Sequence, residues 1–87
     1  MPYTVLYSKK ALKDAKKLSE AGLAGKAQAL VEILTHDPFQ RPPNYEKLVG
    51  NLSGAYSRRI NIQHRLVYQV DEKERTVRIL RMWSHYE

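Results

Sequence analysis

The 87-residue sequence predicts an α+β fold: an antiparallel sheet of four to five strands with a two-helix hairpin packed on one face, in the order β-α-α-β-β-β-β. Three observations predict it. Apolar residues recur with helical spacing over 9–35, they alternate with polar residues over 55–82, and a proline-rich loop over 37–45 separates the two regions. Because a chain this short forms one hydrophobic core, we expect residues 1–87 to make a single domain.

The first third of the chain predicts a short strand and two helices. Residues 3–7 are rich in the β-branched and aromatic types that strands favour. Ser8 is a candidate N-cap for a helix over about 9–20, and a second helix is expected over about 25–35. The expected buried stripes are Ala11, Leu12, Ala15 and Leu18 on the first helix, and Ala27, Leu30, Val31 and Leu34 on the second.

The remaining chain predicts strands over 46–49, 55–62, 65–70 and 75–82. The residues expected to point toward the helices are Ile60, Ile62, Leu66, Tyr68 and Val70. Arg59 and Arg65 then share the open face of neighbouring strands. Alternation from an inward Leu48 points Glu46 inward as well, but a strand that starts from a proline loop can twist or bulge, so the face of Glu46 stays open. Periodicity alone assigns no face to His85 either.

The basic residues favour a polyanion partner. The chain carries 15 Lys and Arg against 9 Asp and Glu, a net charge of +6 that suits nucleic acid or an acidic protein segment. Residues 1–50 hold seven Lys and one Arg, whereas residues 51–87 hold one Lys and six Arg, among them Arg58. Because a guanidinium grips phosphate or carboxylate with two bonds, we interpret the arginine-rich half as the contact surface.

Several classes of protein are excluded or disfavoured. The chain has no Cys, which excludes disulfides, thiolate metal ligands and thiol nucleophiles. Its three His residues are dispersed, so we expect neither a metal site nor a cofactor. No apolar run approaches the roughly 18 residues that span a bilayer, and the N-terminus does not resemble a signal peptide. These features predict a cytoplasmic protein with no membrane association.

Three segments carry a family resemblance. Residues 51–60 read Asn-Leu-Ser-Gly-Ala-Tyr-Ser-Arg-Arg-Ile, residues 64–68 read His-Arg-Leu-Val-Tyr, and His85-Tyr86 precedes the final Glu87. Together they resemble the YoeB/Txe family of bacterial toxins, within the RelE superfamily, over about residues 37–86. Family members commonly have Pro-Glu-Pro-Leu where this chain has Tyr-Glu-Lys-Leu over 45–48.

The resemblance implies the toxin of a type II toxin–antitoxin system, a ribosome-dependent endoribonuclease that cleaves messenger RNA without a metal. The ribose 2′-hydroxyl attacks the adjacent phosphate and the 5′-oxygen leaves. By motif position, Glu46 is the implied base, His85 the acid and Arg65 the group that stabilises the added negative charge. The residues expected to support RNA binding are Arg59, Tyr86, Lys47 and Arg81.

The resemblance also implies partners: an acidic antitoxin of the YefM, Axe or Phd kind, the ribosome and its message. A homodimer and a toxin–antitoxin hetero-oligomer are the assemblies considered. Two other functions compete with the nuclease. One is a gyrase-inhibiting toxin of the ParE type, which generally lacks the Glu, Arg and terminal His-Tyr set. The other is a non-catalytic RNA- or protein-binding module of the same fold.

Overall fold

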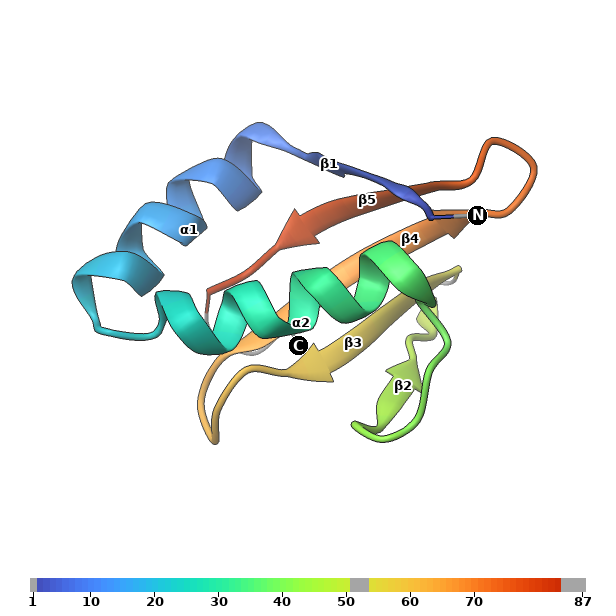
Figure 1. The fold of residues 1–87 in the computed structure, drawn as a ribbon. Helices are drawn as coiled ribbons and strands as arrows, with labels where there is room; N and C mark the ends of the chain where they lie inside the picture. The colour runs from blue at the N-terminus through green and yellow to red at the C-terminus, as the bar shows by residue number, and fades with distance from the viewer. Residues whose placement is uncertain (1, 51–53, 84–87) are drawn as a thin grey trace.

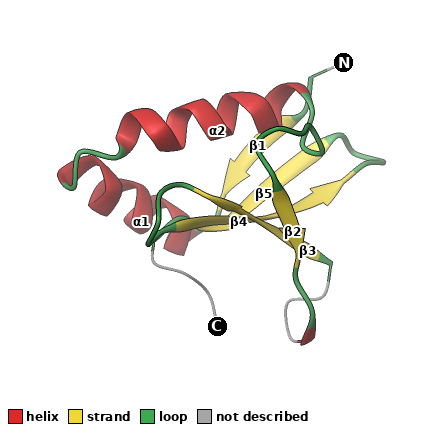
Figure 2. Cartoon of the chain, turned by 90° about the horizontal axis from the view of Figure 1, so that it is seen from below, coloured by secondary structure: helices red, strands yellow, loops and turns green. Residues whose placement is uncertain are grey.

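A computed structural model describes residues 2–50 and 54–83, which form a five-stranded sheet covered on one face by two helices (Figures 1 and 2). The elements in chain order are β1 (Thr4–Tyr7), α1 (Lys9–Glu20), α2 (Ala24–His36), β2 (Tyr45–Lys47), β3 (Ala55–Arg59), β4 (Arg65–Asp71) and β5 (Thr76–Arg81). The predicted α+β layout, with a helical hairpin on one face, is confirmed.

The strands lie in the order β1-β5-β4-β3-β2. The pairs from β2 to β5 are antiparallel, as predicted, but β1 pairs with β5 in parallel, so the sheet is mixed. Strand β1 is therefore an edge strand, and its neighbour β5 is the last strand of the chain. Both helices and the other three strands lie between them in the sequence (Figure 1). None of the helices in the described ranges is long and apolar enough to cross a bilayer.

Helix α1 begins at the predicted N-cap. The Ser8 hydroxyl accepts a hydrogen bond from the Ala11 N–H at 3.0 Å and donates one to the Leu80 carbonyl at 2.9 Å, which ties the helix start to β5. The predicted stripe is wrong at Leu12, which is 57% exposed. The buried positions follow the spacing of Ala11, Asp14 and Leu18, so an acidic residue takes the place next to the sheet.

Helix α2 packs as predicted. Its buried residues are Ala27, Leu30, Val31 and Leu34. They join a core cluster with the inward residues of β4 and β5, which are Leu66, Tyr68, Val77 and Ile79. The helical hairpin and the centre of the sheet therefore form one apolar layer that supports the strands from one side.

The turn between β3 and β4 is longer than predicted. Strand β3 ends at Arg59, and the Ile60 N–H donates to the His64 carbonyl at 2.8 Å across the turn. Ile60 is buried as expected, but the inward placement of Ile62 is wrong, because this residue lies in the turn and is 90% exposed. Alternation stops applying where the ladder ends.

Candidate functional site

The strand register brings Glu46, Arg59 and Arg65 to the open face of the sheet. Glu46 lies opposite Ser57 on β3, and Arg59 lies opposite Arg65 on β4. Leu66 faces the helices, so its neighbour Arg65 faces away from them. Arg59 and Arg65 thus occupy the face that the alternation predicted.

The face of Glu46, which the sequence left open, is the open face of the sheet. Strand β2 covers Tyr45–Lys47, and it is Tyr45 that points to the helix side. The Tyr45 ring lies 6.1 Å from the Phe39 ring and 5.6 Å from the Tyr56 ring, between centroids. Alternation within the strand then directs Glu46 to the open face. Counting from Leu48 gives the opposite face because Leu48 lies beyond the end of β2.

A pocket of about 280 Å³ lies on this part of the open face. Its lining residues are Pro43, Asn44, Glu46, Ser57, Arg59 and Arg65. Arg65 Nη1 lies 3.3 Å from Glu46 Oε1 and 3.4 Å from Ser57 Oγ. The Glu46 side chain is 67% exposed and that of Arg65 is 24% exposed. An ion pair of this exposure adds only about 0–1 kcal/mol to stability, so its value to the fold is small.

The chemistry of this pocket suits a phosphodiester. A guanidinium can hold a phosphate oxygen, and a carboxylate 3.3 Å away from it can accept a proton from a hydroxyl on the same substrate. Arg59 adds a second positive charge to the lining. Within residues 2–50 and 54–83, no three His, Asp or Glu side chains gather closely enough to hold a metal ion.

Arg58 supports this pocket from the opposite face of the sheet. Its side chain is fully buried and lies opposite Leu66 in the register. Its guanidinium donates to three carbonyl oxygens of the proline loop and to the Tyr68 hydroxyl: Pro43 at 2.6 Å, Gln40 at 2.9 Å, Pro38 at 3.0 Å and Tyr68 Oη at 3.1 Å. The interpretation of Arg58 as part of the contact surface is therefore wrong.

These bonds connect the loop 38–43 to the centre of the sheet. The Tyr68 hydroxyl completes the network by donating to the Pro38 carbonyl at 2.9 Å. Burial raises the pKa of Tyr68 against the opposing effect of the Arg58 charge, so the phenol keeps its proton. Because the loop leads directly into β2, Arg58 fixes the backbone that carries Glu46. The sequence held a signal for the burial of Arg58: consecutive residues of a strand face opposite sides, so an outward Arg59 directs Arg58 toward the helices.

Arg81 is bound by Asp14 rather than presented to the pocket. Arg81 Nε lies 2.8 Å from Asp14 Oδ2, and the same carboxylate oxygen accepts the Met82 N–H at 3.0 Å. Burial alone would raise the pKa of Asp14, but these hydrogen bonds and the Arg81 charge outweigh it and leave the pKa below its ordinary value. Asp14 is thus a charged residue in the α1–sheet interface.

The other predicted residues are placed only in part. Lys47 is exposed on β2 and is not part of the pocket lining. His85 and Tyr86 lie outside the described residues. The last described residue, Trp83, stacks on His64, with ring centroids 4.0 Å apart and planes at 23°. Since His64 directly precedes Arg65, the described chain ends beside the start of β4.

Comparison with known proteins decides the family. The model of the YoeB-like toxins of bacterial type II toxin–antitoxin systems matches residues 7–86. The chain belongs to this YoeB-like toxin family. Toxin YoeB of Synechocystis is 40% identical over 58 residues, which cover 67% of this chain and 65% of that protein. Toxin RelG of Mycobacterium tuberculosis is 37% identical over 94% of this chain and 90% of its own length.

Solved structures of YoeB toxins share the fold. The YoeB dimer from Staphylococcus aureus superimposes with a TM-score of 0.82 at 31% identity, covering 99% of this chain and 100% of that one. The YoeB/ParE toxin from Agrobacterium tumefaciens gives a TM-score of 0.86 at 25% identity, covering 95% and 99%. The family resemblance noted in the motifs is confirmed, and so is the RelE-like fold.

Proposed function

We propose that this YoeB-like toxin is a ribosome-dependent endoribonuclease that cleaves messenger RNA and so inhibits translation. The observation that carries the proposal is the open-face pocket in which the Glu46 carboxylate and the Arg65 guanidinium meet at 3.3 Å. A base and a cation at this separation can act on two parts of one phosphodiester. The family resemblance supplies the third group, His85, which lies outside the described residues.

The proposed reaction uses side chains alone. Glu46 accepts the proton of the ribose 2′-hydroxyl, and that oxygen bonds to the adjacent phosphorus. The bond from phosphorus to the 5′-oxygen breaks, which leaves a cyclic phosphate on one fragment. His85 gives its proton to the departing 5′-oxygen, so that the second fragment ends in a hydroxyl. Arg65 stabilises the negative charge that builds on the phosphoryl oxygens during the attack.

The pocket also holds groups that position the message. Ser57 Oγ lies 3.4 Å from Arg65 Nη1 and restrains that guanidinium on the open face. Arg59 is exposed in the lining and is suited to a backbone phosphate. Tyr86 is proposed to stack on a base, and Lys47 to contact the backbone near β2. Arg81 is proposed to contribute less to RNA binding than Arg59, because its side chain is paired with Asp14.

An acidic antitoxin is the proposed regulatory partner. Another solved structure, from Staphylococcus aureus, is that of a YoeB–YefM complex. For this chain the net charge of +6 supports the same kind of partner, a segment whose carboxylates cover the exposed arginines. Such a cover would neutralise the groups that bind RNA. A homodimer and a toxin–antitoxin hetero-oligomer are both compatible with this proposal.

The test is a reconstituted translation reaction with a defined message, in which the 5′ ends of the fragments are mapped. Codon-dependent cuts are expected with the wild type, and they should vanish in Arg65→Ala and His85→Ala. Lys26→Ala, which removes one charge from α2 on the helix layer, is the matched control and should cut normally. An uncut message with arrested DNA supercoiling would establish gyrase inhibition, and binding without either effect would establish a non-catalytic module.

A further inference from the structure

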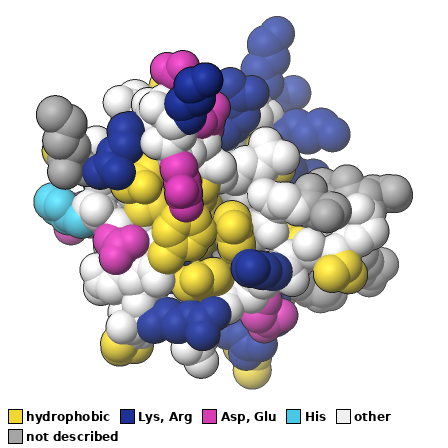
Figure 3. Space-filling model, turned by 90° about the vertical axis from the view of Figure 1, so that its right-hand side faces the viewer, with side chains coloured by type: hydrophobic (Ala, Val, Ile, Leu, Met, Phe, Trp, Pro, Cys, Tyr) yellow, Lys and Arg dark blue, Asp and Glu magenta, His cyan; other side chains and the backbone are white. Residues whose placement is uncertain are grey.

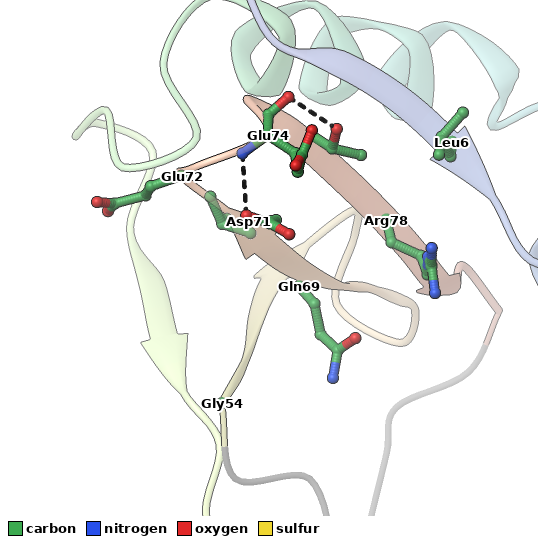
Figure 4. A pocket seen from close by; sticks show the side chains of 9 residues that line it. Leu6, Gly54, Gln69, Asp71, Glu72, Glu74 and Arg78 are labelled. Atoms are coloured by element: carbon green, nitrogen blue, oxygen red, sulfur yellow. Dashed lines mark hydrogen bonds between the residues drawn. The ribbon is translucent and has the colours of Figure 1, made fainter.

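A second pocket, of about 600 Å³, hollows the open face of the sheet beyond the Glu46 pocket (Figure 4). Three of its lining residues form one row across three strands. Leu6 on β1 lies opposite Arg78 on β5, which lies opposite Gln69 on β4. We call these residues the Leu6–Gln69–Arg78 row. A volume of this size falls within the range of small-ligand sites.

The row runs beside the proposed catalytic residues. Gln69 lies opposite Ala55, and Ala55 is two residues along β3 from Ser57, the partner of Glu46. Two residues of a strand span about 7 Å, and both rows face the same side of the sheet. The two pockets therefore lie near one another on the same face of the sheet.

The side chains of the row offer binding groups without internal partners. Within the described part of the chain, the side chains of Arg78 and Gln69 have no hydrogen-bond or ion-pair partner, and both residues are exposed. Figure 4 shows both directed out from the sheet over the pocket. Arg78 can hold a phosphate with two bonds, and the Gln69 amide can both donate to and accept from a base edge. Leu6, 45% exposed, adds an apolar surface.

The far end of the pocket is acidic. Asp71, Glu72 and Glu74 line it from the β4–β5 turn, and Figure 3 shows acidic and basic side chains side by side on this end of the molecule. The turn is internally bonded: Asp71 accepts the Glu74 N–H at 3.0 Å, and the Glu74 carbonyl accepts the Thr76 hydroxyl at 3.1 Å (Figure 4). These carboxylates repel phosphate, so a bound backbone is confined to the part of the pocket nearer Arg65.

We infer that the second pocket is a subsite for an RNA nucleotide near the cleaved bond, with Arg78 on its phosphate and Gln69 on its base. This inference rests on the proposed nuclease function, since it assigns another stretch of the same substrate. The acidic end repels an acidic peptide and an RNA backbone alike, so the choice between these occupants rests on the Gln69 amide, which suits a base edge. A single-stranded RNA matches the remaining groups, because it offers one charge and one flat base for each nucleotide.

The test is a double-mutant cycle in which one change is Arg78→Ala in the protein and the other is the loss of one phosphate charge in the message. Ribosomes are programmed with messages in which one linkage near the cut is replaced by an uncharged methylphosphonate, and single-turnover cleavage is measured against toxin concentration. At one linkage, we expect the replacement to raise the half-maximal concentration about tenfold for the wild type and to have no further effect in Arg78→Ala. Gln69→Ala should instead change the preference for the base at that nucleotide.

Lys26→Ala, which also removes one charge, should keep the wild-type response at every linkage. If the wild type cleaves the unmodified message, the subsite is overturned when Arg78→Ala and each modified linkage raise the half-maximal toxin concentration independently, so that their effects add at every linkage. A wild type that cleaves no message would instead defeat the proposed function. Weaker binding of an acidic antitoxin peptide to Arg78→Ala, with additive RNA effects, would also overturn the subsite and assign the pocket to the partner.

Discussion

The two faces of the sheet use the same residue type in opposite ways. Arg58 points to the helix side, is fully buried and donates to four oxygen atoms at 2.6–3.1 Å. Arg59, the next residue, is exposed on the open face, and Arg65 makes only two longer contacts there, at 3.3 and 3.4 Å. The buried arginine has its donors committed to the fold, whereas the open-face arginines keep theirs available for a ligand.

The comparison shows that the positive charge of a small toxin is not all available for RNA. A buried guanidinium is tolerated only when its donors are satisfied, and Arg58 meets this condition through the proline loop. Its energetic role is to hold the loop against the sheet. Arg59 and Arg65 on the open face are expected to contribute little to stability, which leaves their guanidinium groups available for a ligand. Substitutions on the two faces should therefore separate stability from activity.

The largest effect on stability is expected for Arg58→Met. This change removes the donors to Pro38, Gln40 and Pro43 and leaves buried acceptors unpaired, so it should lower the free energy of unfolding by about 3–5 kcal/mol. Urea denaturation measures the loss. Arg59→Met, one residue along the strand, is the matched control and should stay within about 0.5 kcal/mol of the wild type. Equal losses in the two variants would abolish the distinction between the faces.

The next largest effect is expected for Arg65→Ala, which should lower activity and leave stability nearly unchanged. Losing the proposed transition-state cation should slow single-turnover cleavage by about 100- to 1,000-fold. Because the ion pair with Glu46 is partly exposed, the free energy of unfolding should change by no more than about 1 kcal/mol. Rapid-quench cleavage on programmed ribosomes and urea denaturation give the two values. A stability loss as large as that of Arg58→Met would contradict the account.

Asp14 sharpens the comparison through pH. The pKa of Asp14 is lower in the folded protein than in the unfolded chain, so its contribution to stability is present above about pH 4 and declines as the pH falls through the folded pKa. Asp14→Asn should cost about 1–2 kcal/mol at neutral pH, because Arg81 and the Met82 N–H lose a charged acceptor. The gap between the two proteins should narrow in acid. A gap that stays constant from pH 7 to pH 3 would refute this assignment.

The smallest effect is expected at the start of α1. Ser8→Ala removes the acceptor of the Ala11 N–H and the donor to the Leu80 carbonyl, so unfolding should become easier by about 1 kcal/mol. Cleavage by the folded variant should be unchanged, since Ser8 lies between β1 and α1 and does not line the Glu46 pocket. Thermal denaturation with a parallel cleavage assay checks both. A cleavage defect without a stability loss would place Ser8 in the site.

Local patterns predicted the elements well where one physical signal was dominant. Ser8 was identified as an N-cap, and the stripe of Ala27, Leu30, Val31 and Leu34 was identified as buried, because capping and helical spacing are local properties. The family motifs pointed to Glu46 and Arg65, and their catalytic roles stay predictions. Their contact required the tertiary structure, since the two residues lie 19 apart in the chain.

The failures occurred where tertiary contacts decide. Leu12 was predicted to be buried because apolar side chains prefer the core, but Arg81 makes Asp14 the buried residue of that helix face. Arg58 was counted in the arginine-rich contact surface because a guanidinium grips phosphate or carboxylate. The carbonyls of the proline loop and the Tyr68 hydroxyl explain why it is buried instead. The face of Glu46 stayed open because β2 ends two residues earlier than predicted, so alternation counted from Leu48 does not apply to it.

The most direct test of the account is a double-mutant cycle of Glu46→Gln and Arg65→Ala, measured as the single-turnover cleavage rate on programmed ribosomes. If both groups act on one phosphodiester, the double variant should cleave about as slowly as the slower single variant, because the two losses are not additive. Independent, additive losses, or cleavage at the wild-type rate in either single variant, would contradict the assignment of the open-face pocket as the cleavage site.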